Sequence, residues 1–171
     1  DPQPARLAKA KAMYPALETV TDADLLLGND SIDAVVIATP VSTHFALAKR
    51  ALECGKHVLL EKPMTATVAE AEELVRLAAE RDLRLMVDHT FLYNPAIRTI
   101  RELIGSGQLG DVLYYDSTRI NLGLFQHDVS VVWDLGPHDF AIMDYLVGKQ
   151  PTSMTALGSA FGHEQASVAF I

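Results

Sequence analysis

Cysteine is nearly absent from this sequence, because Cys54 is the only one in 171 residues. Without a second cysteine no internal disulfide can form, which excludes the small domains that disulfides hold together. A single thiol is typical of a reducing compartment, and we expect a cytoplasmic protein. The sequence also lacks a signal peptide and any apolar run near the roughly 18 residues that span a bilayer, so no membrane partner is expected.

Positive charge is also scarce. The sequence has 14 Lys and Arg against 22 Asp and Glu, which gives a formal net charge of -8. Such an acidic chain argues against nucleic acid and anionic membranes as partners. Hydrophobic residues make up 49% and charged residues 21%, as in an ordinary folded globular protein, which excludes a disordered chain.

The first half of the sequence alternates short apolar runs with helical periods. The runs 33–39, 57–63 and 83–90 predict strands, and the segments 41–55 and 67–80 between them predict helices. Strands separated by helices of this length indicate βαβ units, a parallel sheet and right-handed crossovers. Two further helical segments are expected before the first strand, over 2–14 and 22–27.

Local signals mark the ends of these helices. Gly55 is expected to end the helix 41–55 as a C-terminal cap. Thr67 and Glu70 form the T-x-x-E pattern of a capping box, which predicts that a helix begins there. The helical period of that segment predicts a buried face made of Val68, Ala71, Leu74, Val75 and Ala78.

The pattern changes in the second half. Helices are expected over 94–110 and 131–148, and the alternating side chains of 111–120 predict a strand with one wet face. The segments 151–161 and 165–171 predict an antiparallel pair of strands. Gly136 and Pro137 interrupt the second helix, so Pro137 is an alternative helix start, with Asp134 left in the preceding turn or capping the helix.

We therefore place a domain boundary near Asn94. Residues 1–93 are expected to form an α/β half, and residues 94–171 are expected to form an α+β half with an antiparallel pair of strands. The whole is an α/β fold class.

Polar residues follow each of the three expected parallel strands. Thr39-Pro40, Glu61-Lys62-Pro63 and Asp88-His89-Thr90 stand where the three strands end. Turn chemistry accounts for each group taken alone. Open parallel sheets bind ligands at the carboxyl ends of their strands, so the three groups together predict a cleft along one rim.

Two segments resemble one known family. The stretch ATPVSTHFALAKRALECGKHVLLEKPM, residues 38–64, is similar to the signature of the Gfo/Idh/MocA family of NAD(P)-dependent oxidoreductases. The segment WDLGPHDFAIMDYLVG, residues 133–148, resembles the family's second motif, with an aspartate and a histidine four residues apart. The resemblance runs from Asp1 to Ile171.

The resemblance implies a fold and a reaction. Such proteins join an N-terminal, dinucleotide-binding Rossmann domain to a C-terminal α+β domain built on a large, mostly antiparallel sheet. Residues 1–93 would be part of the first, and residues 94–171 would be part of the second, which would bind substrate and form oligomer contacts. These proteins move a hydride between nicotinamide and a sugar, cyclitol or nucleotide-sugar carbon. The catalytic trio would be Lys62, Asp134 and His138. Lys62 would stabilise charge on the substrate oxygen, His138 would act as acid or base, and Asp134 would orient it or bind a substrate hydroxyl.

The same resemblance implies which residues line the cofactor groove. The expected set is Asp1, Thr39, Pro40, His44, Glu61, Lys62 and Pro63, with a cis peptide bond before Pro63. Asp1 would hold the adenosine ribose and favour NAD, although NADP is possible. Glu61 and Lys62 have a simpler reading as a solvated ion pair, and His44 as a polar helix start.

One family feature is absent from this sequence. The first strand and its G-x-G-x-x-G loop, which would cradle the pyrophosphate, have no counterpart here. The antiparallel sheet also stops after its first strands. We therefore expect the chain to be an internal piece of a protein roughly twice as long, and by itself a poor dinucleotide binder.

The expected substrate pocket contains His89, Tyr93, Arg119, Asn121 and Trp133. For some of these the alternatives remain open: Tyr93 and Trp133 could simply pack, and Arg119 and Asn121 could lie on a solvated face. A rival reading assigns His127, Asp128, Asp88, His89, His138 and Asp139 to a metal site, although their spacing matches no compact ligand motif, and no metal is expected.

Two further expectations concern the whole protein. The intact trio favours an enzyme over a non-catalytic dinucleotide or sugar sensor with the same fold. An unpaired sheet face with Leu113 and Tyr115 would need covering, so a homodimer or homotetramer through the C-terminal sheet is expected.

Overall fold

The computed structural model describes residues 1–120, 129–161, 164 and 166–171. Its first half is built on a parallel sheet in the order β1 (Ala34–Ile37), β2 (His57–Leu60), β3 (Leu85–Val87). The register pairs Ile37 with Leu60 and Leu60 with Val87, so the three strands end at one rim. The parallel sheet expected from the alternation of apolar runs and helical periods is confirmed.

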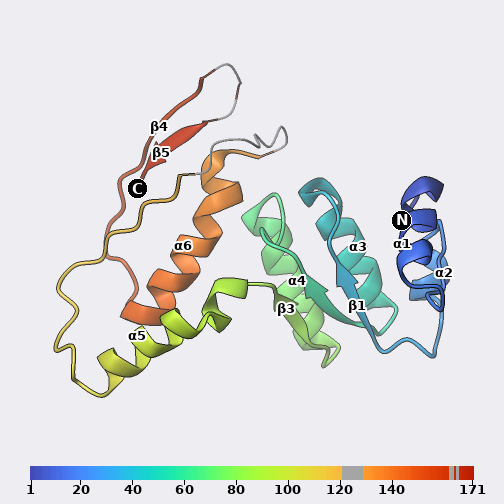
Figure 1. Ribbon diagram of the computed structural model, residues 1–171, viewed down its shortest axis with the longest axis horizontal. Helices are drawn as coiled ribbons and strands as arrows, with labels where there is room; N and C mark the ends of the chain where they lie inside the picture. Colours follow the sequence, from blue (N-terminus) through green and yellow to red (C-terminus); the bar gives the residue numbers. More distant parts are fainter. Residues whose placement is uncertain (121–128, 162–163, 165) are drawn as a thin grey trace.

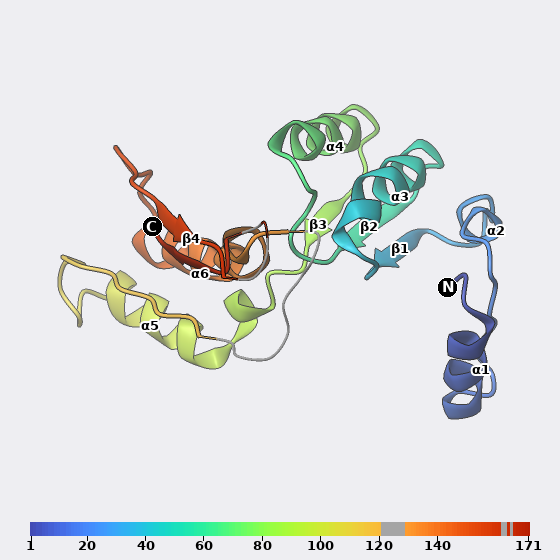
Figure 2. The ribbon, with the colours of Figure 1, turned by 90° about the horizontal axis from the view of Figure 1, so that it is seen from above.

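Two helices cover one face of this sheet (Figure 2). Helix α3 (Val41–Glu53) connects β1 to β2, and α4 (Val68–Glu80) connects β2 to β3. The core between helices and sheet is made of aliphatic side chains that are almost fully buried, among them Ile37, Leu52, Val58, Leu60 and Leu74. Burial of such side chains contributes roughly 1.5–3 kcal/mol each, which holds the rim of the sheet in place.

The boundary signals of both helices are confirmed. Gly55 follows the end of α3 with φ of 75°, a left-handed conformation that favours glycine. The side chain of Thr67 accepts from the amide of Glu70, and the carboxylate of Glu70 accepts from the amide of Thr67. The predicted buried face of α4 was wrong at two positions. Val68 and Val75 are exposed, because only the stripe around Leu74 and Ala78 faces the sheet.

Two helices precede β1. Helix α1 spans Pro4–Met13, with proline in its first turn as expected, and α2 spans Asp24–Leu27. Only Leu27 from these two helices joins the core of the sheet. The N-terminus and α1 lie at one end of the molecule, opposite the end formed by the second half (Figure 1).

The second half begins with a single 3-10 turn, η1 (Thr90–Tyr93), that leads from β3 into α5 (Pro95–Gly105). The side chain of Asn94 caps α5 by accepting from the amide of Ala96. Helix α6 (Val131–Val147) packs against α5 and η1, and β4 (Leu157–Ser159) pairs antiparallel with β5 (Val168–Phe170). The expected helices and the antiparallel pair are therefore confirmed.

Two predictions for this half were wrong. Residues 111–120 lie outside any helix or strand. Alternation of apolar and polar side chains predicts which face of a strand would be exposed to solvent. A strand also needs a neighbouring strand for its backbone hydrogen bonds, and here β4 and β5 pair with each other. The alternative helix start at Pro137 was also wrong, because α6 begins at Val131 and continues through that proline.

No helix among the described residues is long and apolar enough to cross a membrane.

Candidate active site

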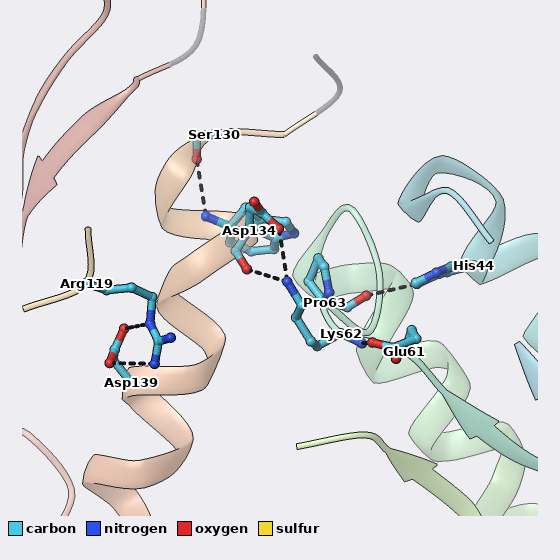
Figure 3. A network of polar contacts seen from close by, with 9 residues as sticks. His44, Glu61, Lys62, Pro63, Arg119, Ser130, Asp134 and Asp139 are labelled. Carbon is cyan, nitrogen blue, oxygen red and sulfur yellow. Dashed lines mark hydrogen bonds and ion pairs between the residues drawn. The ribbon is translucent and has the colours of Figure 1, made fainter. Parts of the chain in front are cut away.

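Lys62 and Asp134 join the two halves of the molecule. The ammonium of Lys62 donates to the backbone carbonyl oxygen of Asp134 at 2.8 Å and to its Oδ1 at 3.0 Å (Figure 3). Both side chains are about one-fifth exposed, at 19% and 20%. An ion pair in this partly buried position is held more firmly than a surface pair, so the reading of Glu61-Lys62 as a solvated surface pair does not fit.

The segment that carries Lys62 is fixed to the sheet. The amide of Glu61 donates to the carbonyl of Ile37 at 3.0 Å, which continues the pairing of β2 with β1 by one residue. The carboxylate of Glu61 in turn accepts from the amide of Lys62 at 3.2 Å. The peptide bond between Lys62 and Pro63 is cis, as expected. Lys62 therefore leaves the rim from a backbone that is anchored on β1.

His44 reinforces this anchor from α3. Its side chain is buried, with Nδ1 at 2.9 Å from the carbonyl oxygen of Pro63 and Nε2 at 2.9 Å from that of Thr39. The ring thus connects the segments that follow β1 and β2. Figure 3 shows its contact with Pro63. The reading of His44 as a solvated helix start therefore does not fit, because the side chain is buried. Both ring nitrogens contact backbone carbonyl oxygens, so neither nitrogen faces the expected cofactor groove.

Helix α6 places Asp134 and His138 one turn apart. The side chain of Ser130 caps the helix by accepting from the amide of Trp133, so Asp134 is not the cap. Pro137 has no amide hydrogen, so the carbonyl of Trp133, four residues before it, receives no intrahelical hydrogen bond from that position. The carbonyl of Asp134, the next residue, accepts from the ammonium of Lys62.

His138 lies in a partly buried and electropositive position. Its ring meets Phe91 edge-on, with the ring centroids 4.8 Å apart. Burial lowers the pKa of His138 below its ordinary value, and the positive charges of Lys62 and Arg119 lower the pKa further. Its Nδ1 has no hydrogen-bond partner within the described part of the chain. The imidazole is therefore neutral near pH 7 and able to accept a proton.

His89 occupies a similar environment at the start of η1. Burial lowers its pKa, and the neighbouring Asp88 opposes this effect. Its Nδ1 is buried and, like that of His138, has no partner among the described residues. His89 also acts on the charge of His138, which places the two imidazoles in one electrostatic environment.

Arg119 and Asp139 form a second ion pair beside His138. Arg119 donates from Nε to Oδ2 of Asp139 at 2.8 Å and from its NH2 group to Oδ1 at 3.2 Å, and the hydroxyl of Ser117 also donates to Oδ1. Burial alone would raise the pKa of Asp139, but the hydrogen bonds from Arg119 and Ser117 hold it below its ordinary value. The guanidinium lies over the ring of Phe91, 4.9 Å from its centroid.

A shallow hollow of about 270 Å³ adjoins these residues. It is lined by Thr90, Phe91, Tyr93 and Asn94. Phe91 lines this hollow and also contacts the ring of His138 and the guanidinium of Arg119, although neither His138 nor Arg119 lines the hollow itself. Tyr93 is half exposed and lies under the guanidinium of Arg98, which excludes a fully buried core position.

The remaining predicted residues fall in three places. Thr39 and Pro40 lie at the rim, where the hydroxyl of Thr39 is 2.7 Å from that of Thr43. Asp1 lies beside α1, accepts from the amide of Gln3, and is far from α6 (Figure 1). Asn121, like His127 and Asp128 of the rival metal site, lies outside the described residues. Within the described part of the chain, no group of three or more His, Cys, Asp or Glu is placed to hold a metal ion.

Sequence reasoning missed three contributors to this site. Asp139 was considered only as a metal ligand, although its position next to His138 could have suggested a partner for a nearby cation. Phe91 and Thr65 gave no signal in the sequence. Thr65 contributes its backbone carbonyl, which accepts from Nε1 of Trp133 at 2.8 Å. Neither an aromatic ring in a turn nor a backbone carbonyl has a sequence pattern of its own.

Two family profiles match the chain. One, described as an oxidoreductase family with an NAD-binding Rossmann fold, matches residues 1–89. The other, the GFO/IDH/MocA C-terminal domain, matches residues 97–170.

Individual relatives agree with these profiles. UDP-N-acetylglucosamine 3-dehydrogenase of Acidithiobacillus ferrooxidans is 37% identical, over 81% of this chain and 43% of its own length. The scyllo-inositol 2-dehydrogenase (NADP(+)) IolW of Bacillus subtilis is 30% identical, over 88% of the chain and 44% of its own length. The solved structure of yvaA from Bacillus subtilis superposes with a TM-score of 0.83 at 29% identity, over 96% of this chain and 50% of that one. The chain thus spans about half the length, or less, of the proteins it matches.

Proposed function

Because the chain belongs to the Gfo/Idh/MocA family of oxidoreductases, we propose that the whole protein moves a hydride between a nicotinamide dinucleotide and a secondary alcohol or ketone. The substrate would be a sugar, cyclitol or nucleotide-sugar. The observation that carries the proposal is the contact of Lys62, from the Rossmann half, with Asp134, one turn from His138 on α6. The names of the relatives support the substrate class.

The rim of the parallel sheet fits a dinucleotide. The hydroxyl of Thr39 and the carboxylate of Glu61 follow adjacent strands, where open parallel sheets bind nucleotides, and they supply the acceptors that ribose hydroxyls need. NAD would supply a hydride acceptor there. We propose that Asp1 favours NAD over NADP. Because one relative is named as an NADP(+) enzyme, both dinucleotides are included in the test below.

Lys62 would act electrostatically. Oxidation of an alcohol builds negative charge on its oxygen, and an ammonium aimed at that oxygen stabilises the charge. Asp134 fixes the orientation of the ammonium group, because both its carboxylate and its backbone carbonyl accept hydrogen bonds from Nζ. An amine held by two oxygens from one residue needs little rearrangement when a substrate hydroxyl arrives.

His138 would accept the hydroxyl proton. Its lowered pKa keeps the ring neutral at pH 7, which is the form that a base requires. In the direction of ketone reduction the same ring would return the proton. The hollow beside Phe91 would receive the substrate, with His89 and Tyr93 at its edge.

Turnover of sugars tests the proposed function. The protein from the complete reading frame is mixed with NAD or NADP and UDP-N-acetylglucosamine, scyllo-inositol, myo-inositol or glucose, and the absorbance of reduced nicotinamide is followed. We expect reduction with at least one member of the panel. Tight binding of NAD without any reduction would instead favour a non-catalytic dinucleotide or sugar sensor.

The pH dependence of oxidation tests the role of His138. A base must be unprotonated, so the rate should fall as the pH drops through the pKa of His138, which lies below the ordinary value of 6.5. Arg119→Gln removes a charge that lowers this pKa and should move the acid limb of kcat/KM to higher pH. Asp139→Asn removes a charge that raises it and should move the limb to lower pH. If the acid limb stays in place in both variants, or moves in the same direction in both, His138 is not the base that titrates in the reaction.

We also propose that the whole protein forms a homodimer or homotetramer through its C-terminal half. Large apolar side chains of β4, β5 and the segment before β4 are exposed, including Leu157, Phe170 and Met154. Leu113, outside any strand, is 93% exposed. Apolar surface of this extent favours a covering partner, and a second copy of the same sheet is the simplest one.

A further inference from the structure

The backbone that follows Lys62 is rigidly held by the first half. Pro63 is tied through its carbonyl to His44. Thr65 is almost fully buried, and its hydroxyl donates to the carbonyl of Thr67, which belongs to the capping box of α4. The carbonyl oxygen of Thr65 is therefore fixed relative to both helices that cover the sheet.

A side chain from the second half reaches this carbonyl. Trp133 lies in the first turn of α6, and its Nε1 donates to the oxygen of Thr65 at 2.8 Å. The next residue, Asp134, accepts from Lys62. Two neighbouring residues of α6 thus bind two points of the 61–67 segment, and the amine takes part only in the contact with Asp134.

The two contacts suit different tasks. Under the proposed function the ammonium of Lys62 shares its donors between Asp134 and a substrate oxygen, so its contact with Asp134 is not reserved for holding α6 in place. The indole of Trp133 binds a backbone carbonyl that takes no part in the chemistry. The covalent connection between the halves is the turn η1 and the residues beside it, which alone would leave their angle adjustable.

We propose that Trp133 is a positioning residue, whose N–H bond to the Thr65 carbonyl sets the placement of Asp134 and His138 relative to Lys62. The expected effect on kcat rests on the proposed function. The expected effect on the position of α6 beside Lys62 does not. This assigns the indole to the contact between the halves instead of the substrate pocket expected from the sequence.

Chemical labelling of lysines tests the placement without a substrate. In the whole protein, Trp133→Phe keeps an aromatic ring and removes the N–H. We expect trinitrobenzenesulfonate to modify Lys62 about three- to tenfold faster, because loss of one hydrogen bond lets α6 move away from the amine. Peptide mass spectrometry gives the rate for each lysine. Lys49, bonded to Glu73 between α3 and α4, is the matched control and should react at an unchanged rate.

A second variant separates the hydrogen bond from the bulk of the ring. Site-specific replacement of Trp133 by β-(3-benzothienyl)alanine keeps the bicyclic shape and removes only the donor. Faster labelling of Lys62 in this protein supports the proposal. Labelling at the wild-type rate overturns it, whatever Trp133→Phe shows. If Trp133→Phe unfolds the protein, Lys49 reacts faster too, and the benzothienyl protein decides.

Steady-state kinetics then connects placement to catalysis. With a substrate from the panel, kcat of the benzothienyl protein should fall about tenfold, while KM for the dinucleotide stays within about twofold. Equal changes in both constants would indicate a general loss of structure and would contradict a positioning role. Absence of turnover in the wild type would count against the proposed function only, because the labelling result stands alone.

Discussion

Replacing Lys62 by methionine is expected to lower kcat of the whole protein about a thousandfold, while the dissociation constant of the dinucleotide should change by less than about threefold. The reason is electrostatic: a donor aimed at a developing oxyanion is worth roughly 10²–10³ in rate, and here the donor also carries a full charge. Methionine keeps most of the length of the side chain. The measurements are initial rates with saturating sugar and a titration of the dinucleotide.

Lys49→Met is the matched control for this experiment. Lys49 also donates to a carboxylate, that of Glu73, but the pair joins α3 to α4 away from the rim. Its removal should leave kcat within about twofold, since surface ion pairs contribute roughly 0–1 kcal/mol to stability and nothing to the reaction. Turnover by Lys62→Met that approaches the wild-type rate would exclude the amine from the mechanism.

Replacing His138 by asparagine is expected to lower kcat by about 10²–10⁴, the range that general acid–base catalysis supplies. Asparagine retains a polar side chain of similar reach but cannot take up a proton near neutral pH. The acid limb of the pH profile should therefore disappear together with the rate. The residual activity is best measured with enzyme concentrations high enough to follow single turnovers.

His57→Asn provides the comparison for a histidine remote from the rim. His57 begins β2, and its Nδ1 accepts from the amide of Arg84, at the end of the sheet opposite Lys62. Its replacement should leave both the rate and the acid limb in place. An acid limb that persists in His138→Asn would show that another group, His89 foremost, titrates in the reaction.

The fold of the first half could be predicted well because its signals are local. A capping box, a glycine with positive φ and runs of β-branched residues each fix a few neighbouring dihedral angles. The rim followed from these elements, since three parallel strands in order must end on one side. The prediction failed where a local pattern needed a distant partner. Residues 111–120 alternate like a strand but pair with no strand in the described part of the chain. Val68 and Val75 fit the helical period, but they lie on the exposed side of α4.

The site was predictable in its members and not in their contacts. The motifs named Lys62, Asp134 and His138, whose roles stay predictions until they are tested. They did not reveal that Trp133 donates to a carbonyl 68 residues away, or that Arg119 binds Asp139 instead of lying free for a substrate. Pro137 shows the same limit, because packing against α5 and η1 and the cap of Ser130 keep α6 continuous through a residue that usually ends a helix.

By itself, the sequence determined the helices and parallel strands of the first half, where those strands end, and which polar residues stand at those ends. Only the tertiary structure decided that the first turn of α6 meets the segment after β2, so that an amine and a carboxylate 72 residues apart become partners. The physical reason is the distance along the chain over which each effect acts. Backbone preferences and helix caps act over three or four residues. The contact between Lys62 and Asp134 depends on how the two halves of the molecule pack together, which no single segment encodes.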